Sequence, residues 1–590
     1  VADPDGESIV SVDVDGKKQL GVLPLGAAAA QLLVLPDGRL LATLPAADRV
    51  AVVRVSDAGA LTMTCTRATS AEPFGLATSA RGDRIYVSAG WGARLEGFDG
   101  ELGNKGGVDL PRDPRQIVLS DDEKTAFVSH AVGGIVSVVD LGTMRSSTPV
   151  LVWADPRDQD DPAGPRSLAA AMTSAVGKGS QPVAGQNGMR TGLQGYALVK
   201  SSDPPGRLLL PQVLVDPGNP EGRAEEFGNS GGVHLPNIAV IDAATKTPLS
   251  ASLSTNQNMA IFFEDDSRFS GVQPTAAGCM LPRGAAFDAE SGSLLVACLG
   301  SDMVVAYDGA SATPTAVEMK RWDVGSGPTG VAVDAPKRRA IAWSQFERSL
   351  DVLPFSDLGV VIEPDGRPRR DKIDLSPLQK PPALAFLLGR QIFHGVADIR
   401  ISSEGVACAS CHPEGRDDGL TWATPEGPRR TPMLAGRMEP PLGWLGANED
   451  LERHLDAEFL RLHGQGLRSV QREALMAYLS GLRPPPKRKT DAALAEKGKE
   501  LFSSKGCATC HPGGGTDGKT HDVGSKRSGD KKAAFDTPSL RHLAGRAPYF
   551  HDGRFKSVRE VLEQPHGDKT STPKIAPNEI APLEAYLLGL

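Results

Sequence analysis

The chain has 590 residues, too many for a single hydrophobic core, and its 40% hydrophobic and 23% charged residues are typical of a globular protein. A net charge of -8 at pH 7 gives no support for nucleic-acid binding, and no apolar run approaches the roughly 18 residues that a membrane span needs. The 66 glycines and 46 prolines indicate many turns and short strands. We therefore expect several domains, no nucleic-acid partner and no membrane span.

Residues 1–360 repeat a weak pattern of two short apolar stretches separated by a turn. Residues 31–35 and 39–43 form an early copy, and residues 330–334 with 340–343 form the last one. The copies recur about every 40 to 45 residues, which is the period of a four-stranded propeller blade. They resemble the YVTN-type bacterial propeller repeats. We predict a β-propeller with seven blades, of which residues 8–14 begin one, or with six.

One segment interrupts the propeller repeat, and another follows its last copy. Residues from about 151 to 236 are rich in Pro, Gly and Asp, and they predict an insertion that is either a surface excursion of one blade or a loop reaching toward the C-terminal domains. Residues 361–380 predict a linker, after which the pattern becomes helical.

Two Cys-x-x-Cys-His motifs dominate the C-terminal part. In such a motif the two thiols bind the vinyl groups of one porphyrin and the imidazole ligates its iron. A single Cys-x-x-Cys could instead be a zinc or thiol redox site. Two copies in one repeated frame, with nine of the eleven histidines after residue 380, predict two covalently bound c-type haems. The predicted haem-binding residues are Cys408, Cys411, His412, Cys507, Cys510 and His511.

The frame around these motifs is itself duplicated. Residues 389–393 match 498–502 before each motif, and the closing segment 473–482 matches 582–590. We predict two mainly α-helical cytochrome c domains, residues 381–483 with the first haem and residues 490–590 with the second. The fold class is therefore multidomain β plus α, with the propeller preceding the two cytochrome c domains.

The cysteines also predict the compartment. Haem c is attached outside the bacterial cytoplasm, and a chain that begins Val1-Ala2-Asp3 without Met fits either a processed secreted protein or a trimmed one. Cys279 and Cys298 could pair in such an oxidising space or remain thiols. We expect a periplasmic bacterial protein.

Residues from about 380 to 590 resemble the bacterial di-haem cytochrome c peroxidases and MauG-type enzymes. The segments that carry the resemblance are CASCHP at 408–413, GPRRTP at 427–432 and APYFHDGR at 547–554. In that family one haem binds peroxide, the other relays electrons, and a tryptophan bridges them. The resemblance implies that Trp444 is the bridging residue, the alternative being an ordinary core aromatic.

The first haem departs from the peroxidase pattern. Peroxidases of this family usually place a ligating His in the loop after the first motif, whereas residues 413–453 contain no His and Trp422 falls near that position. We therefore expect an open distal side, as in MauG-type enzymes. Glu458 and His463 are the candidate distal acid–base residues, the alternative for each being a surface helix position. Ligation by His394 or His454 would close the site.

The second haem departs as well. Its counterpart in the peroxidases is usually Met-ligated, but no Met follows Met476. His566 lies near the position of that ligand, with Tyr549 or Tyr586 as the fallback, and a second imidazole would lower the reduction potential. His551 is interpreted as a structural residue or one near a propionate.

The family's calcium site is expected to be absent. The resemblance places an Asn, a Thr and a carbonyl around calcium between the haem domains, and the matching side chains here are Arg430 and Arg546. Guanidinium groups cannot ligate a cation, so we expect iron but no calcium.

Together these features predict a periplasmic di-haem c oxidoreductase of the peroxidase or MauG type. Peroxide or oxygen would be activated at the first haem, and electrons would pass from the second haem through Trp444. Within enzymes, the alternative is oxidation of a redox-partner protein or an organic substrate docked by the propeller. Outside enzymes, it is a di-haem electron carrier or a propeller-docked binding module without turnover, whose irons would bind neither cyanide nor carbon monoxide.

Overall fold

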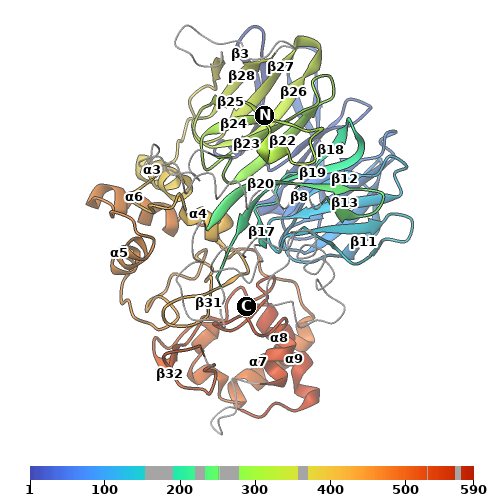
Figure 1. Ribbon diagram of the computed structural model, residues 1–590. Coiled ribbons are helices and arrows are strands. Elements are labelled where there is room, and N and C mark those ends of the chain that lie inside the picture. The colour runs from blue at the N-terminus through green and yellow to red at the C-terminus, as the bar shows by residue number, and fades with distance from the viewer. Residues whose placement is uncertain are drawn as a thin grey trace, which may run out of the picture. The chain divides into compact units, whose positions relative to one another are not determined.

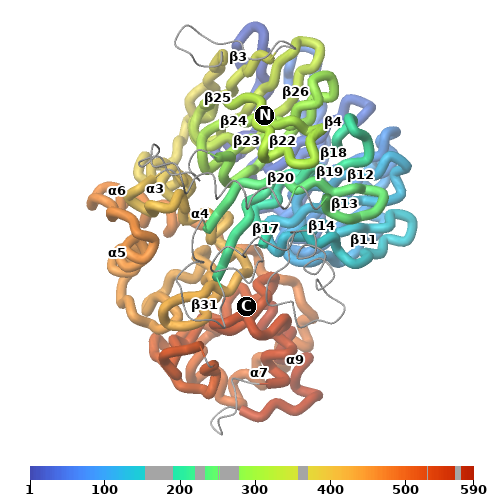
Figure 2. The backbone as a smooth tube through the Cα atoms, viewed as in Figure 1, coloured from blue at the N-terminus to red at the C-terminus, as the bar shows by residue number. Residues whose placement is uncertain are grey.

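The computed structural model describes most of the chain, and its contacts divide it into two units (Figures 1 and 2). No helix among the described residues is long and apolar enough to cross a membrane. The described residues are 1–152, 191–218, 233–249, 252, 278–355, 370–396, 398–527, 529–564 and 573–590. Of these, 216–218, 233 and 399–590 form the second unit, and the rest form the first.

The first unit contains seven antiparallel sheets, which is the seven-bladed propeller that the repeats predicted. The first sheet contains β1 Ala2–Asp3, β2 Ser8–Asp13 and β3 Lys18–Pro24. The second contains β4 Leu32–Val34, β5 Leu40–Leu44, β6 Arg49–Val55 and β7 Leu61–Ala68. The third contains β8 Pro73–Thr78, β9 Arg84–Ala89, β10 Arg94–Asp99 and β11 Asn104–Asp109. The fourth and fifth are β12 Pro114–Leu119, β13 Thr125–His130, β14 Ile135–Asp140, β15 Arg145–Ser146 and β16 Val150–Leu151; and β17 Thr191–Leu193, β18 Val199–Ser202, β19 Pro205–Val215, β20 His234–Asp242 and β21 Thr247–Pro248. The last two are β22 Pro282–Asp288, β23 Ser293–Cys298, β24 Met303–Asp308 and β25 Glu318–Asp323; and β26 Pro328–Asp334, β27 Arg339–Ser344, β28 Ser349–Pro354 and β29 Asp371–Asp374.

Seven hydrophobic clusters join each sheet to the next and close the ring. Phe127 of the fourth sheet packs with Leu208 of the fifth, and Leu209 packs with Val296 of the sixth. The last cluster joins Val10 of the first sheet to Trp343 of the seventh. Successive side chains of a strand point to opposite faces, so Leu208 and Leu209 serve two different clusters. Each inner strand is therefore apolar on both faces, which explains the short apolar runs of the sequence.

The ends of the propeller differ in detail from the sequence prediction. The predicted linker, residues 361–380, contains β29, which pairs with β28 because Ile373 is buried in the last cluster. The predicted insertion from 151 to 236 contains β17, β18 and β19, while its residues 153–190 and 219–232 lie outside the described residues. Helix α3 Leu384–His394, expected in the first cytochrome domain, has most of its contacts in the first unit.

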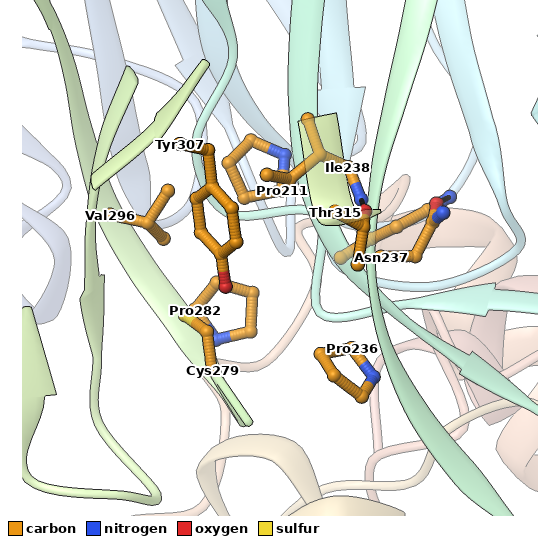
Figure 3. Close-up of a pocket in the computed structure, with 10 residues that line it drawn as sticks. Pro211, Pro236, Asn237, Ile238, Cys279, Pro282, Val296, Tyr307 and Thr315 are labelled. Carbon is orange, nitrogen blue, oxygen red and sulfur yellow. Dashed lines mark hydrogen bonds between the residues drawn. The ribbon is translucent and has the colours of Figure 1, made fainter. Parts of the chain in front are cut away.

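A disulfide and a small cavity lie between the fifth and sixth sheets. Cys279 and Cys298 are joined, which settles the choice that the sequence left open. Cys279 lines the cavity with Tyr307, Asn237 and Thr315 (Figure 3). Asn237 and Thr315 are engaged in hydrogen bonds with Gln212 and with the backbone, so these polar groups stabilise the junction between the two blades.

The second unit is mainly helical and contains both haem motifs. Its helices are α4 Cys408–Cys411, α5 Leu451–Arg461, α6 Ser469–Ser480, α7 Ala492–Ser504, α8 Val558–Glu563 and α9 Pro577–Leu588. Its strands are β30 Thr421–Trp422 paired with β31 Arg429–Arg430, and β32 Thr520–His521 paired with β33 Phe535–Asp536.

The duplication seen in the sequence is also present in the backbone. After each motif comes a short 3-10 turn, and its last residue, Gly415 or Gly514, has a positive φ of 74° or 76°. A Cβ on Gly415 would lie 2.6 Å from Leu482, and one on Gly514 would lie 2.8 Å from Leu590. Each glycine thus allows its motif to lie against the end of the closing helical segment of its own half.

Candidate haem sites and the residues between them

The first motif is formed by α4 and the residue that follows it. One helical turn places Cys408 and Cys411 on the same side, as attachment to a single porphyrin requires. His412 donates from Nδ1 to the carbonyl of Arg416 at 3.1 Å, which orients the ring and would leave Nε2 available to ligate a haem iron. Burial lowers the pKa of His412, so its ring is neutral and able to ligate a metal.

The second motif has the same local geometry. The 3-10 turn Cys507–Thr509 brings Cys507 near Cys510, and Nδ1 of His511 donates to the carbonyl of Gly515 at 3.3 Å. None of the four motif cysteines is in a disulfide. Two thiols outside any disulfide beside an oriented imidazole in each half therefore fit covalent haem c in both places.

The motifs differ in their surroundings. Ala409 and Ser410, between the first pair of cysteines, are buried. In the second motif, Ala508 is half-buried and Thr509 is exposed. The second motif is therefore the one whose attachment loop is open to solvent.

Trp422 lies in the first half, where the family usually supplies a ligating His. It is buried, and its indole Nε1 donates to Asp418 at 3.1 Å and to Thr431 at 2.9 Å. Burial raises the pKa of Asp418 to about 7. An indole offers no lone pair to iron, so Trp422 cannot take the place of the missing His as a ligand.

Helix α5 brings two titratable side chains near His412. Burial has the largest effect on the pKa of His412. Among the smaller effects, the negative charge of Glu458 raises this pKa, and a positive charge on His454 lowers it. Both side chains are half-buried, and Nδ1 of His454 forms a hydrogen bond of 3.0 Å with Asn448. His463 differs, since its side chain is 65% exposed and bonds to Glu404 at 3.2 Å. The structure thus brings Glu458 and His454 to the motif, but not His463.

His394 lies in the first unit. Its ring packs against Phe346 and Phe393 with centroid distances of 5.2 and 5.1 Å, and its Nδ1 donates to the carbonyl of Arg390 at 2.8 Å. Burial lowers the pKa of His394 to about 3, so the ring is neutral at physiological pH. These contacts give His394 a packing role in the propeller unit.

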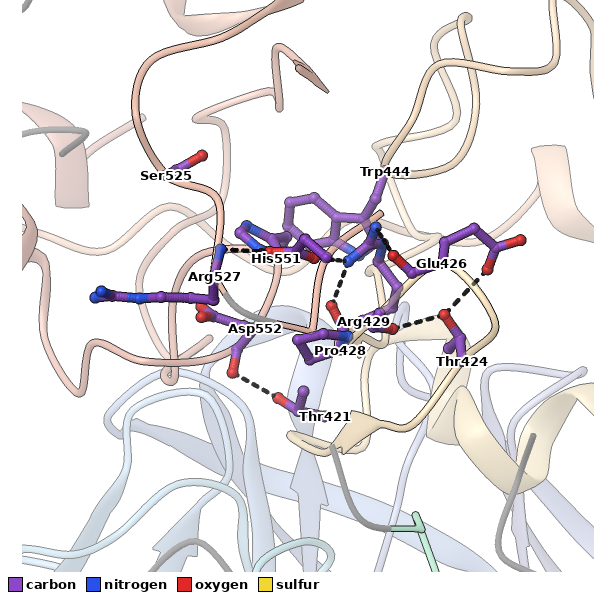
Figure 4. A network of polar contacts seen from close by, with 12 residues as sticks. Thr421, Thr424, Glu426, Pro428, Arg429, Trp444, Ser525, Arg527, His551 and Asp552 are labelled. Carbon is purple, nitrogen blue, oxygen red and sulfur yellow. Dashed lines mark hydrogen bonds and ion pairs between the residues drawn. The ribbon is translucent and has the colours of Figure 1, made fainter. Parts of the chain in front are cut away.

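Trp444 contacts both halves of the second unit. Its Nε1 donates to the carbonyl of Arg430 in the first half at 2.6 Å, and its own carbonyl accepts from the backbone N–H of Asp536 in the second half at 3.0 Å. Its ring meets His551 edge to face, with centroids 6.3 Å apart. Figure 4 shows the indole beside His551 and Arg429. Trp444 therefore lies at the junction of the duplicated halves.

His551 belongs to a buried network at this junction. Its ring stacks on Phe535 at 4.0 Å, and its Nε2 bonds to Asp530 at 2.9 Å. Arg429 donates to the other oxygen of Asp530 at 2.6 Å. Burial alone would raise the pKa of Asp530, but the bonds from His551, the Arg527 backbone and Arg429 outweigh it and lower the pKa to about 2. This network supports the structural interpretation of His551.

Arg430 and Arg546 converge on one carboxylate. Arg430 Nη2 is 2.6 Å from an oxygen of Asp417, and Arg546 Nε is 3.5 Å from the other oxygen. All three side chains are buried. The two guanidinium groups bring positive charge to the position at which the resemblance would place calcium.

The proposed axial ligand of the second haem, His566, lies outside the described residues. The fallback residues are engaged elsewhere: the Tyr549 hydroxyl donates to the Leu543 carbonyl at 2.8 Å, and Tyr586 packs on Phe502 with centroids 5.3 Å apart. Neither contact favours a tyrosine as the ligand.

Sequence reasoning missed two groups of residues. Asp530 and Arg429 form a hydrogen bond although they are 101 positions apart in the sequence, and no local sequence pattern predicts that pairing. Asp517 and His521 lie next to Cys510, with one ligand atom from each residue within 4.8 Å of the others. Their separation of only eleven positions from Cys510 to His521 was the signal that could have suggested this cluster.

Comparisons with known proteins agree with the haem assignment. The cytochrome c family model matches residues 495–590. Hydrazine synthase subunit gamma of Kuenenia stuttgartiensis is 27% identical over 254 residues, covering 31% of this chain and 72% of that protein. The methylamine utilization protein MauG of Methylorubrum extorquens is 30% identical over 238 residues, covering 30% of this chain and 67% of that protein.

A solved structure of Kuenenia stuttgartiensis hydrazine synthase aligns with a TM-score of 0.43 and 15% identity, over 60% of this chain and 91% of that one. The sequence matches, together with the two Cys-x-x-Cys-His sites, identify a haem-based oxidoreductase. Through its C-terminal part, the chain belongs to the MauG family.

Proposed function

We propose that the chain is a periplasmic di-haem c oxidoreductase that activates peroxide, or oxygen, at the first haem, with electrons passing to it from the second haem through Trp444. A redox-partner protein or an organic molecule docked by the propeller would be the substrate. The observation that carries this proposal is the position of Trp444, bonded to Arg430 of one half and in contact with His551 of the other.

The two imidazoles have the simplest role. His412 and His511 would each hold one iron through Nε2, and His566 would be the second ligand of the second haem. Haem iron supplies one-electron chemistry and the activation of oxygen or peroxide. The backbone carbonyls of Arg416 and Gly515 orient the two imidazoles, and thioether bonds to the four motif cysteines would prevent loss of the cofactor.

Glu458 is the proposed distal acid–base residue. Splitting of a peroxide requires one oxygen to lose a proton and the other to gain one, and a carboxylate can carry that proton. Glu458 is half-buried and its charge acts on His412, whereas His463 points to solvent. The structure thus favours Glu458 over His463.

Trp444 is proposed to carry charge without releasing its proton. Its N–H donates to a backbone carbonyl, which is not a base and cannot accept that proton. The hydrogen bond fixes the plane of the indole, and the contact with His551 holds the opposite side. The residue is positioned for electron transfer in which no proton leaves the indole.

The electron-carrier function is kept as a second candidate because His454 also lies near His412. Ligation of the first iron by His454 would close that site to peroxide. Cyanide or carbon monoxide would then leave the spectrum of the native protein unchanged, whereas the proposed enzyme binds one of these ligands at the first haem.

Rapid mixing with hydrogen peroxide tests the main proposal. We expect Glu458→Gln to slow the reaction of the first haem with peroxide by about 100-fold, the lower end of the range for general acid–base catalysis. His463→Gln, the matched control on the same segment, should stay within about twofold because its side chain is 65% exposed. Equal effects of the two variants, or no reaction of the native protein with peroxide, would contradict the proposal.

A further inference from the structure

The C-terminal part of the chain is basic, although the whole chain is acidic. Residues 481–590 contain 19 Lys and Arg against 13 Asp and Glu, whereas the chain contains 64 against 72. Several of these basic residues lie on one hairpin, between Lys519 and β33. Its exposed basic residues, here called the basic hairpin, are Lys519, Lys526, Arg527, Lys531 and Lys532.

The charges of the basic hairpin are not neutralised by the neighbouring acids. No ion pair joins any of its five residues to a carboxylate within the described parts of the chain. The nearby carboxylates have other partners. Asp517 bonds to His521 at 2.8 Å, Asp530 bonds to Arg429, and Glu426, whose carbonyl accepts from the Lys531 N–H, lies 3.6 Å from Arg461. Asp522, an exposed carboxylate of the same stretch, accepts from the Gly524 N–H, and the five exposed basic residues outnumber it, so the hairpin presents a net positive surface to solvent.

This hairpin begins beside the attachment site of the second haem. His521 of β32 and Asp517, just before it, each place a side-chain atom within 4.8 Å of the Cys510 thiol. Thr509, inside the motif, is exposed. A protein that covered the hairpin would therefore come close to the second haem.

The corresponding hairpin of the first half offers no such surface. Residues 413–432 contain no Lys, and their three arginines, Arg416, Arg429 and Arg430, are buried. Arg429 and Arg430 are paired with Asp530 and Asp417. The positive surface is thus specific to the half with the exposed motif, which a general excess of lysine would not produce.

We propose that the basic hairpin is the docking surface for an acidic electron-transfer protein that exchanges electrons with the second haem. The inference rests on the proposed relay role of that haem. In the step, one electron leaves the reduced partner and one ferric haem becomes ferrous, with no proton or bond change. Opposite charges accelerate association, and the effect weakens as salt screens them.

Binding to a plant-type [2Fe–2S] ferredoxin, a small acidic protein, tests the proposal on the full holoprotein. By isothermal titration calorimetry we expect binding at about 20 mM salt that weakens by about tenfold or more at about 200 mM. The triple variant Lys526→Glu, Lys531→Glu, Lys532→Glu should weaken it by at least about tenfold at low salt. The control is Lys497→Glu with Lys499→Glu, which reverses two exposed charges on α7. It should bind within about threefold of the native protein.

Stopped-flow reduction of the second haem by the reduced ferredoxin gives the functional readout. We expect the rate constant to follow the same order among variants, and mitochondrial cytochrome c, a basic protein, to show no binding. Equal losses in the hairpin and α7 variants, or binding that salt does not change, would overturn the proposal. So would tight binding of the hairpin to phosphatidylserine vesicles without ferredoxin binding, because that outcome would indicate a membrane surface.

The two proposals fail separately. If the first haem does not react with peroxide, the ferredoxin affinities can still be measured. If ferredoxin does not bind while peroxide does react, only the docking surface is wrong. Unchanged visible spectra and dithionite reduction in each variant show that its haems are intact.

Discussion

The two halves of the haem unit share a backbone plan and differ in what surrounds it. Each half places a Cys-x-x-Cys-His motif before a 3-10 turn, and Gly415 and Gly514 end those turns with nearly the same φ. The hairpin that follows is buried and paired in the first half, but exposed and rich in lysine in the second. A duplicated scaffold can thus keep its haem-binding geometry while burial and charge adapt each copy to a different task.

Loss of one motif cysteine should have the largest effect, and it tests whether the two halves bind haem in the same way. We expect Cys408→Ala and Cys507→Ala each to lose secure attachment of one haem, because a porphyrin then keeps at most one thioether bond. The pyridine haemochrome of the denatured, acid–acetone-extracted native protein should show two covalent haems per chain, and that of each variant should show fewer. Extraction of all haem from the native protein would show that the attachment is not covalent.

The coordination of the two irons should differ if the halves have diverged in function. The resting ferric protein should give one high-spin and one low-spin signal by electron paramagnetic resonance, since the first half lacks a His after its motif and the second has His566. His566→Ala should convert the low-spin signal to high-spin. Two low-spin signals unaffected by cyanide would instead indicate an electron carrier.

Trp444→Phe tests whether the halves communicate through the indole. Phenylalanine keeps most of the packing volume but removes the N–H bond to Arg430 and the readily oxidised ring. We expect normal folding and two haems, with electron transfer between them at least about tenfold slower, equivalent to a barrier higher by about 1.4 kcal/mol. Rapid-scan spectroscopy after peroxide addition measures it. An unchanged rate would leave Trp444 with a packing role only.

Asp530→Asn tests how firmly the halves are joined. The variant leaves Arg429 charged and buried without its carboxylate, which should lower the free energy of unfolding by about 3 kcal/mol at pH 7. The depressed pKa of Asp530, about 2, means that the carboxylate contributes its stabilisation above pH about 4 and loses it as the pH falls toward 2.

Denaturant melts of native protein and variant should therefore approach each other as the pH falls to about 2. Asp522→Asn, at an exposed position of the same hairpin, is the matched control and should change the stability by less than about 0.5 kcal/mol. A difference between Asp530→Asn and the native protein that did not depend on pH would argue against an ionised, hydrogen-bonded Asp530.

Removal of calcium should have the smallest effect. Because Arg430 and Arg546 already bring positive charge to Asp417, we expect EDTA treatment to leave the spectra, spin states and peroxide reaction unchanged. Calcium found in the native protein by elemental analysis, together with a spectral change on chelation, would contradict this expectation.

The sequence predicted what is encoded locally. Strand alternation and repeat spacing gave the seven blades, and the Cys-x-x-Cys-His motifs gave the haem sites, because each depends on residues close in the chain. The structure added β29 to the last blade, since a four-residue strand with one buried Ile373 is too short to recognise. The Arg429–Asp530 pair, and the preference for Glu458 over His463, depend on tertiary contacts that periodicity does not reveal.

The propeller ring closes without a strand shared between its two ends. Among the described residues, the first sheet is built from N-terminal strands and the last from β26 to β29, and no backbone ladder between them crosses that seam. Side chains hold it instead: Val10 packs on Trp343, and buried Asp3 accepts from Arg348 at 2.7 Å. Arg390 of α3 likewise binds Asp5 through two bonds of 2.7 and 2.8 Å. The first few residues thus hold the first and last sheets together. Trimming or charge reversal there should let the ring open between these two sheets, while the other six sheet–sheet interfaces stay packed.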